Sequence, residues 1–185
     1  MFKKSKIKKY NSGMTLIELL VVLAIFAIIS GITMFDYSSF KSSASLNNLA
    51  NDISLSIRKA QSYAIGAKGI NSSFSDIYGV HFSTDNKSSF SVFANTSDNS
   101  IEELSITSGD YISGFIINNG NQQQTGVLDI TFKRPNPDAS FSYNGSYVSA
   151  SNVDIILSSQ KGDRSKIIQI TNTGQISIQN DVQQN

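Results

Sequence analysis

The feature that most constrains this chain is an apolar run, Met14 to Phe35, that contains a single charged residue, Glu18. The uncharged part, Leu19 to Phe35, is seventeen residues long. Together with the four residues from Met14 it reaches the about 20 residues that a helix needs to cross a hydrocarbon core of about 30 Å. A carboxylate at the centre of a bilayer costs about 2.5–3.5 kcal/mol on insertion scales. Glu18 must therefore lie at the edge of the membrane or have a partner.

A basic leader precedes the apolar run. It contains five lysines and no acidic residue: Lys3, Lys4, Lys6, Lys8 and Lys9. A basic segment followed by an apolar run is typical of a secretory signal, but the residues after the run, "SGITMFDYSSF", offer no clear cleavage site of the A-x-A kind. Lysines stay on the cytoplasmic side, so we expect the N-terminus inside and the C-terminus outside. On hydropathy alone, the segment is a plain membrane anchor.

The residues around Gly13 suggest more than an anchor. "SGMTLIELLVVLAIFAIIS" closely resembles the N-terminal signal of type IV prepilins and type II secretion pseudopilins. In that family a dedicated membrane peptidase cuts after a glycine and methylates the new N-terminal amine, and the fifth mature residue is a glutamate. Gly13 matches the residue before the cut, Met14 the new N-terminus and Glu18 the fifth position. Met14 departs from the phenylalanine that is usual there.

The resemblance also implies a role for Glu18. In the family this glutamate pairs with the N-terminal amine of a neighbouring subunit in a filament. The pair is buried among helices, so its geometry must be good to offset desolvation. The alternative is a carboxylate tolerated at the membrane interface, near a helix N-terminus that favours negative charge by roughly 0.3–1 kcal/mol.

The helix is expected to continue beyond the membrane. Apolar residues in the following segment recur at spacings of three and four, which places them on one helix face: Leu46, Leu49, Ala50, Ile53, Ile57, Ala60 and Ala64. Gly66 and Gly69 are stop signals, and the polar stretch "DYSSFKSS" is the expected kink or interface. We therefore predict a leader at 1–13, a membrane and assembly helix at 14–35, an amphipathic continuation at 36–67, a β-rich head at 68–180 and a tail at 181–185.

The head is predicted from short runs rich in β-branched and aromatic residues, separated by turn clusters. Strands are expected at 77–82, 89–94, 103–106, 114–118, 127–132, 140–143, 153–158, 166–171 and 175–179. The last two form a hairpin around Asn172 and Gly174. The predicted fold class is α+β, pilin-like: a long N-terminal helix packed on a small antiparallel sheet or sandwich.

A finer resemblance lies in the body of the chain. "LANDISLSIRKAQSYAIGAKGI", with Arg58, Ala60 and Ala64, is similar to the helix end of the GspH/FimT pseudopilin family. "VLDITFKRPNPDASF" resembles its phenylalanine–proline segment and "KIIQITNTGQISI" its closing hairpin. This implies a minor subunit. A major pilin is the alternative, but many of these carry a C-terminal cysteine pair and a proline in the membrane helix, and this sequence has neither.

Charge bears on nucleic-acid binding. Without residues 1–13 the chain has ten basic and fourteen acidic residues, a net charge of −4, which argues against a generally basic surface. Some members of the resembled family bind DNA through arginines after the turn glycine of the closing hairpin. Here Gly174 is followed by Gln175, Ile176 and Ser177. Lys161, Arg164 and Lys166 could make weak, salt-sensitive phosphate contacts, so a DNA-binding minor pilin stays open as an alternative.

No catalytic or metal site is expected, and no cofactor. Cysteine is absent, and the lone histidine, His81, lies in a strand-like run with no nucleophile motif around any serine. Glu102 and Glu103 are adjacent and so face opposite sides of a strand. With Asp98 they match no calcium loop. A membrane-anchored enzyme is the remote alternative, and a concave cluster of polar residues would favour it.

The sequence thus predicts a minor pilin or pseudopilin subunit, not an enzyme. The expected partners are prepilin peptidase, other pilin subunits, the inner-membrane assembly platform and membrane lipid. The expected location is the inner membrane, with one pass, and then a filament outside the cytoplasm. Secretion, motility, adhesion and competence systems share these features, and the sequence does not separate them.

Overall fold

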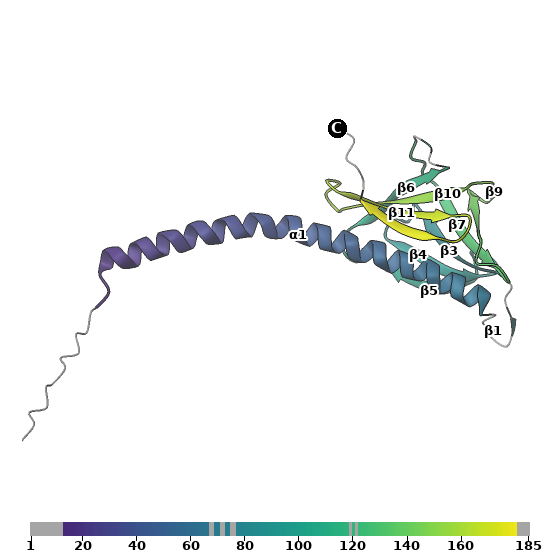
Figure 1. Cartoon of the computed structure of the whole chain (residues 1–185), viewed down its shortest axis with the longest axis horizontal. Coiled ribbons are helices and arrows are strands. Elements are labelled where there is room, and N and C mark those ends of the chain that lie inside the picture. Colours follow the sequence, from purple (N-terminus) through teal and green to yellow (C-terminus); the bar gives the residue numbers. More distant parts are fainter. Residues whose placement is uncertain are drawn as a thin grey trace, which may run out of the picture. The chain divides into compact units, whose positions relative to one another are not determined.

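The computed structural model describes residues 13–66, 69–70, 73–74, 77–118, 120 and 122–180, the side chains of 34–39, 70, 73–74 and 180 excepted. The chain divides into two compact units, Met1–Phe40 and Lys41–Asn185 (Figure 1). The boundary between them falls inside the polar stretch where we predicted a kink or interface. Most of the predicted leader and the whole predicted tail lie outside the described residues.

Helix α1 (Leu16–Ile65) has a sequence-encoded start and stop. Thr15 caps it: its hydroxyl oxygen accepts the Glu18 N–H at 3.3 Å, and its carbonyl accepts the Leu19 N–H at 3.2 Å. Thr-x-x-Glu is the signature of a capping box, with an acidic residue in the first turn. The helix ends directly before Gly66, one of the two expected stop signals.

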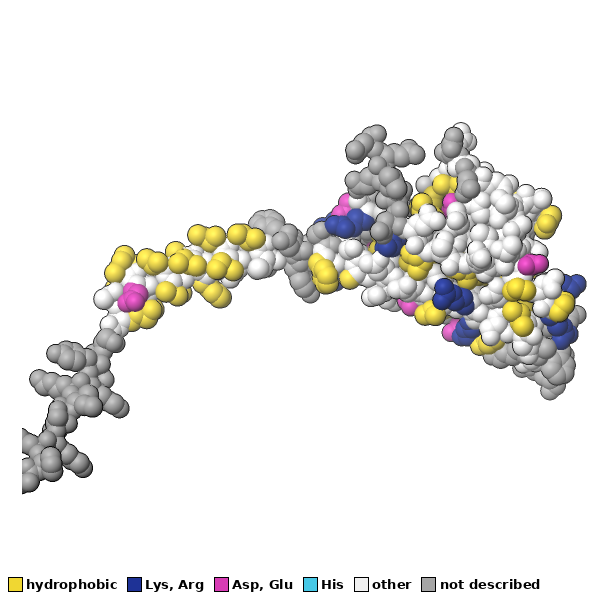
Figure 2. All heavy atoms as spheres, viewed as in Figure 1, with side chains coloured by type: hydrophobic (Ala, Val, Ile, Leu, Met, Phe, Trp, Pro, Cys, Tyr) yellow, Lys and Arg dark blue, Asp and Glu magenta, His cyan; other side chains and the backbone are white. Residues whose placement is uncertain are grey.

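The first unit contains one candidate membrane span among the described residues, Leu16–Thr33. It is long and apolar enough to cross a bilayer, and none of it is buried within the structure. Figure 2 shows apolar side chains along the surface of this part of the helix. The prediction of an apolar helix of membrane-spanning length is confirmed.

The second unit adds twelve strands in the described residues, all paired antiparallel. They are β1 (Gly69–Ile70), β2 (Ser73–Phe74), β3 (Ile77–Ser83), β4 (Ser89–Ala94), β5 (Ser100–Ser105), β6 (Tyr111–Ile117), β7 (Val127–Lys133), β8 (Ala139–Tyr143), β9 (Ser146–Val148), β10 (Asn152–Ser158), β11 (Ser165–Thr171) and β12 (Ile176–Asn180). One sheet has the order β12-β11-β10-β6, another has β5-β4-β3-β7-β8-β9, and β1 and β2 pair with each other.

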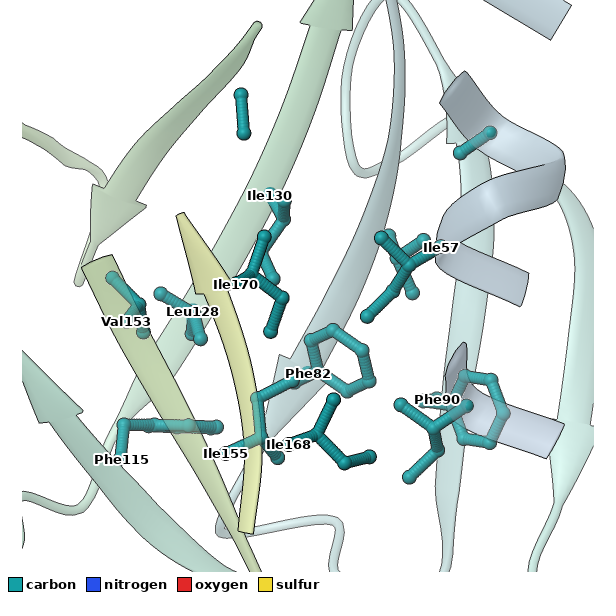
Figure 3. Packing of buried hydrophobic residues seen from close by; sticks show 14 of the residues in the cluster. Ile57, Phe82, Phe90, Phe115, Leu128, Ile130, Val153, Ile155, Ile168 and Ile170 are labelled. Atoms are coloured by element: carbon teal, nitrogen blue, oxygen red, sulfur yellow. The ribbon is translucent and has the colours of Figure 1, made fainter. Parts of the chain in front are cut away.

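One hydrophobic core joins the helix to both large sheets. The seven apolar residues predicted on one helix face are all buried, with exposures from 0 to 6%. Ile57 of α1, Phe82 of β3 and Ile170 of β11 are completely buried members of this core (Figure 3). Since helix and strands bury their apolar faces together, the predicted α+β, pilin-like fold class is confirmed.

The strand predictions are confirmed in most places and need correction in a few. The predicted closing hairpin is present, and its register places Ile168 opposite Ile178 and Ile170 opposite Ile176. The strand predicted at 103–106 is β5, which runs from Ser100 to Ser105. Strands β1, β2 and β9 were not predicted. The signal for β9 was present, since Asn144 and Gly145 have φ of 48° and 77°, as an Asn-Gly hairpin turn requires.

Candidate processing and assembly site

The predicted cleavage point lies just before the helix. Gly13 and Met14 are outside α1, and both are exposed, Met14 by 61%. A Cβ added to Gly13 would have no heavy atom within 4 Å. The peptide bond between these two residues is therefore accessible to an enzyme and is not held in helical hydrogen bonds.

Glu18 occupies the third position of the helix, where Thr15 fixes its backbone. The residues around it are apolar and exposed: Leu16 by 76%, Ile17 by 66% and Leu19 by 50%. The Glu18 side chain has no ion-pair partner among the described residues, while the positive end of the helix dipole stabilises its charge locally. The arrangement places one carboxylate on an otherwise apolar surface.

Sequence reasoning placed Glu18 near the helix start but missed the capping role of Thr15, although the Thr-x-x-Glu pattern that indicates it is present in the sequence.

The comparisons with known proteins bear on this same segment. Residues 8–34 match the family described as the prokaryotic N-terminal methylation motif. The matched range contains Gly13, Met14, Thr15 and Glu18 together with the candidate membrane span. Comparison with curated proteins gave no match, and comparison with solved structures gave none either.

The methylation motif supports a type IV pilin-like protein. Its presence implies processing by prepilin peptidase and assembly with other pilins, and with the apolar helix it indicates a single-pass membrane-anchored chain. Proteins that carry the motif are structural subunits rather than enzymes. The GspH/FimT resemblance concerns residues outside the matched range and stays a prediction.

The three cations predicted for weak nucleic-acid contact lie where β10 turns into β11. The turn is closed by the Ser159 N–H, which donates to the Arg164 carbonyl at 2.9 Å, and Gly162 adopts a φ of 70° within it. Lys161 and Arg164 are exposed in the turn, and Lys166 is half-buried at the start of β11. The structure therefore brings the three residues to one end of the sheet.

An acidic residue shares that turn. The Ser159 hydroxyl donates to Asp163 Oδ1 at 2.6 Å, and this hydrogen bond is the main cause of a lowered pKa at Asp163. The Asp163 backbone N–H and the nearby cations Arg164 and Lys161 lower that pKa further. The carboxylate therefore stays charged beside Lys161 and Arg164. It reduces the attraction of the turn for phosphate.

His81 is paired across strands. It lies on β3 opposite Asp129 of β7 and opposite Ser91 of β4, and its Nδ1 is 2.6 Å from Asp129 Oδ1. The order Ser–His–Asp resembles a hydrolase triad, but the Ser91 hydroxyl has no hydrogen bond to the imidazole. The backbone of these central strands is committed to ladder pairing, which leaves no pair of N–H groups for an oxyanion. The contact is an ion pair and not a nucleophilic site.

The His81–Asp129 pair makes stability depend on pH. The hydrogen bond to Asp129 raises the pKa of His81 above its ordinary value of 6.5. The pair therefore stabilises the fold fully below pH 6.5, and that stabilisation is lost as pH rises through the folded pKa. We expect Asp129→Asn to lower the free energy of unfolding by about 1 kcal/mol at pH 5.5 and by clearly less at pH 9.

Urea unfolding of the full chain in detergent at both pH values measures this difference. Asp138→Asn is the control, because Asp138 is exposed in the loop before β8 and the same charge is removed. A destabilisation by Asp129→Asn that is equal at the two pH values contradicts the assignment.

The two adjacent glutamates diverge, as the sequence predicts. Glu102 forms an ion pair with Lys59 of α1, and this contact raises the pKa of Lys59. Glu103 faces the other way and accepts a hydrogen bond from the Ser89 hydroxyl at 3.1 Å. Within the described part of the chain, no group of three His, Cys, Asp or Glu side chains could hold a metal ion.

Proposed function

We propose that this chain is a minor pilin or pseudopilin subunit that is cut after Gly13, methylated on Met14 and built into a filament. The observation that carries the proposal is the methylation motif at residues 8–34. Its support is the accessible Gly13–Met14 bond, the capped helix start and the apolar surface that follows. After insertion the head lies outside the cytoplasm, and the inner-membrane assembly platform and neighbouring subunits are its partners.

The role proposed for Glu18 follows from its surroundings. A carboxylate flanked by exposed apolar side chains becomes desolvated when those side chains pack against other helices. Removing a charge from water costs several kcal/mol unless a cation compensates it. The methylated amine of a neighbouring subunit supplies that cation, so a subunit in the wrong register is left with an unpaired buried charge.

The minor-subunit assignment draws on a contact between three segments of the GspH/FimT resemblance. Gln61 near the helix end donates through Nε2 to the Pro137 carbonyl at 2.8 Å and to the Gly174 carbonyl at 3.2 Å. The helix end, the proline segment and the closing hairpin thus meet at one side chain. This agrees with a head of that type, in which these three segments are the recognisable ones.

Mass spectrometry of the N-terminus tests the proposal. The protein is isolated from membranes that contain prepilin peptidase, and the expected chain begins with methylated Met14. A chain that retains residues 1–13 overturns the proposal and leaves an ordinary anchored β domain.

Replacing the carboxylate of Glu18 is expected to stop assembly after normal processing. Glu18→Ala removes the charge that pairs with the neighbouring amine, while the membrane span stays intact. The mature N-terminus, read by mass spectrometry, should be unchanged, and incorporation into sheared filaments should fall to background. Thr33→Ala, a substitution near the other end of the span, is the control. Normal incorporation of the Glu18→Ala subunit would contradict the pairing role.

A DNA-binding minor pilin is the second candidate, favoured by the hydrogen-bonded turn in which Lys161 and Arg164 are exposed. Three phosphate contacts give a slope of log K against log salt of about −2 to −3. Replacement of Lys161, Arg164 and Lys166 by alanine should abolish gel-shift binding if this function is real. Binding that is unchanged in the triple variant excludes this turn as the contact.

A further inference from the structure

The outer face of the six-stranded sheet carries a small polar pocket. Its volume is about 200 Å³, and strands β3, β4 and β5 contribute its principal side chains: His81, Ser89, Ser91 and Glu103. This is smaller than the roughly 300 Å³ at which pockets for drug-sized ligands begin. The space suits a ligand the size of a single ring. We call it the His81 pocket.

Several side chains of the His81 pocket are held in place by hydrogen bonds. Asp129 holds the imidazole through Nδ1 at 2.6 Å. Asn86 Nδ2 donates to Ser89 Oγ at 2.7 Å, and Ser89 Oγ donates to Glu103 Oε1 at 3.1 Å. The orientations of His81 and Glu103 are therefore fixed before any ligand arrives, which lowers the entropic cost of binding.

Three polar atoms in the pocket remain available. His81 Nε2, Ser91 Oγ and the second carboxylate oxygen of Glu103 have no hydrogen-bond partner among the described residues. A hydroxyl can both donate and accept, the carboxylate accepts only, and the imidazole nitrogen accepts when neutral and donates when protonated. The set matches a ligand that presents several hydroxyl groups.

The charges around the pocket select against anionic ligands. Glu103 and Asp129 repel an anion, and Asp98 lies close enough to His81 to act on its charge. A neutral ligand avoids that repulsion.

We propose that the His81 pocket binds one ring of a neutral saccharide. Glu103 accepts hydrogen bonds from ring hydroxyl groups. The Ser91 hydroxyl forms a hydrogen bond with a third hydroxyl group or with the ring oxygen, and His81 Nε2 forms one with a further hydroxyl group. The pocket lies in the second unit, outside the residues of the methylation motif. Its role is therefore independent of whether the chain joins a filament.

Saturation-transfer NMR on the full chain tests the proposal. The protein is held in a detergent with a zwitterionic, sugar-free headgroup, and the probes are the methyl glycosides of glucose, galactose, mannose and N-acetylglucosamine. We expect transfer to at least one glycoside at millimolar concentration. Glu103→Ala and Ser91→Ala should each weaken that binding tenfold or more.

Ser142→Ala is the matched control. Ser142 is on the same sheet face, opposite Asp129 on β8 and outside the pocket, so binding should be unchanged. The thermal midpoint of each variant is recorded, and a binding loss counts only when the midpoint is preserved. The absence of transfer to every glycoside overturns the proposal. So does transfer that survives both pocket variants, or stronger transfer to methylammonium or to methyl phosphate than to the glycosides.

Discussion

A Gly13→Val chain is expected to accumulate as an uncut precursor that keeps residues 1–13. Gly13 is exposed before the helix, and an added Cβ would meet no heavy atom within 4 Å in the free chain. The substitution therefore leaves the fold untouched, and any steric conflict arises in the peptidase, which must admit the backbone on both sides of the cut. The processed fraction, measured by gel mobility and by the mass of the N-terminal peptide, should fall from near completeness to background.

Gly31→Val is the matched control for this experiment. Gly31 lies within the candidate span, and an added Cβ there also meets nothing within 4 Å. The same change of side chain should be processed normally. Cleavage of the Gly13→Val chain at the wild-type rate contradicts the assignment of Gly13 as the residue before the cut.

A Gly174→Ala substitution is expected to lower the free energy of unfolding of the head by about 2–4 kcal/mol. Gly174 has a φ of 79°, and its Cβ would lie 2.2 Å from the Pro137 carbonyl oxygen and 2.5 Å from Gln61 Nε2. The left-handed backbone alone costs an alanine roughly 1–2 kcal/mol. The remainder comes from displacing the Pro137 backbone and breaking the bonds that Gln61 makes.

The control for Gly174→Ala separates these two causes. Gly145 has a φ of 77°, but its Cβ would meet nothing within 4 Å. Gly145→Ala should therefore lose only the backbone contribution. Urea unfolding of each full-length variant in detergent, followed by tyrosine fluorescence, gives the comparison. Equal losses for the two substitutions show that the turn at Gly174 is not tightly packed against Pro137.

Local pattern was enough to predict much of the fold. The spacing of Leu46, Ile53 and Ile57 identified the buried helix face because a helix repeats every 3.6 residues. Alternation in the last two strands predicted the closing hairpin, because strand side chains repeat every two residues. The fixed spacing of Gly13, Met14 and Glu18 located the candidate processing site by resemblance, since these residues are adjacent in the chain.

What the sequence did not reveal depends on distant segments. β10 lies between β11 and β6 in its sheet. The apolar sequence of β10 predicts a strand, but it does not indicate that its second neighbour is β6, some forty positions earlier in the chain. The same holds for His81 and Asp129, which are 48 residues apart. The His81 pocket draws on three strands, so it exists only once their registers are fixed. Thr15 is different, because its capping role could have been predicted from the local sequence: Thr15 and Glu18 are only three residues apart.

The meeting of Gln61 with Gly174 has a consequence for the order of folding. These residues are 113 positions apart, and the buried Ile168 and Ile170 that complete the core are also near the end of the chain. A nascent chain that has emerged only as far as β8 lacks β10 and β11, and so lacks part of the core that covers the apolar face of its helix. Contacts of such sequence separation form slowly, because the loop must be closed before they stabilise anything. We therefore expect the core of the head to be completed only after the last hairpin has been synthesised.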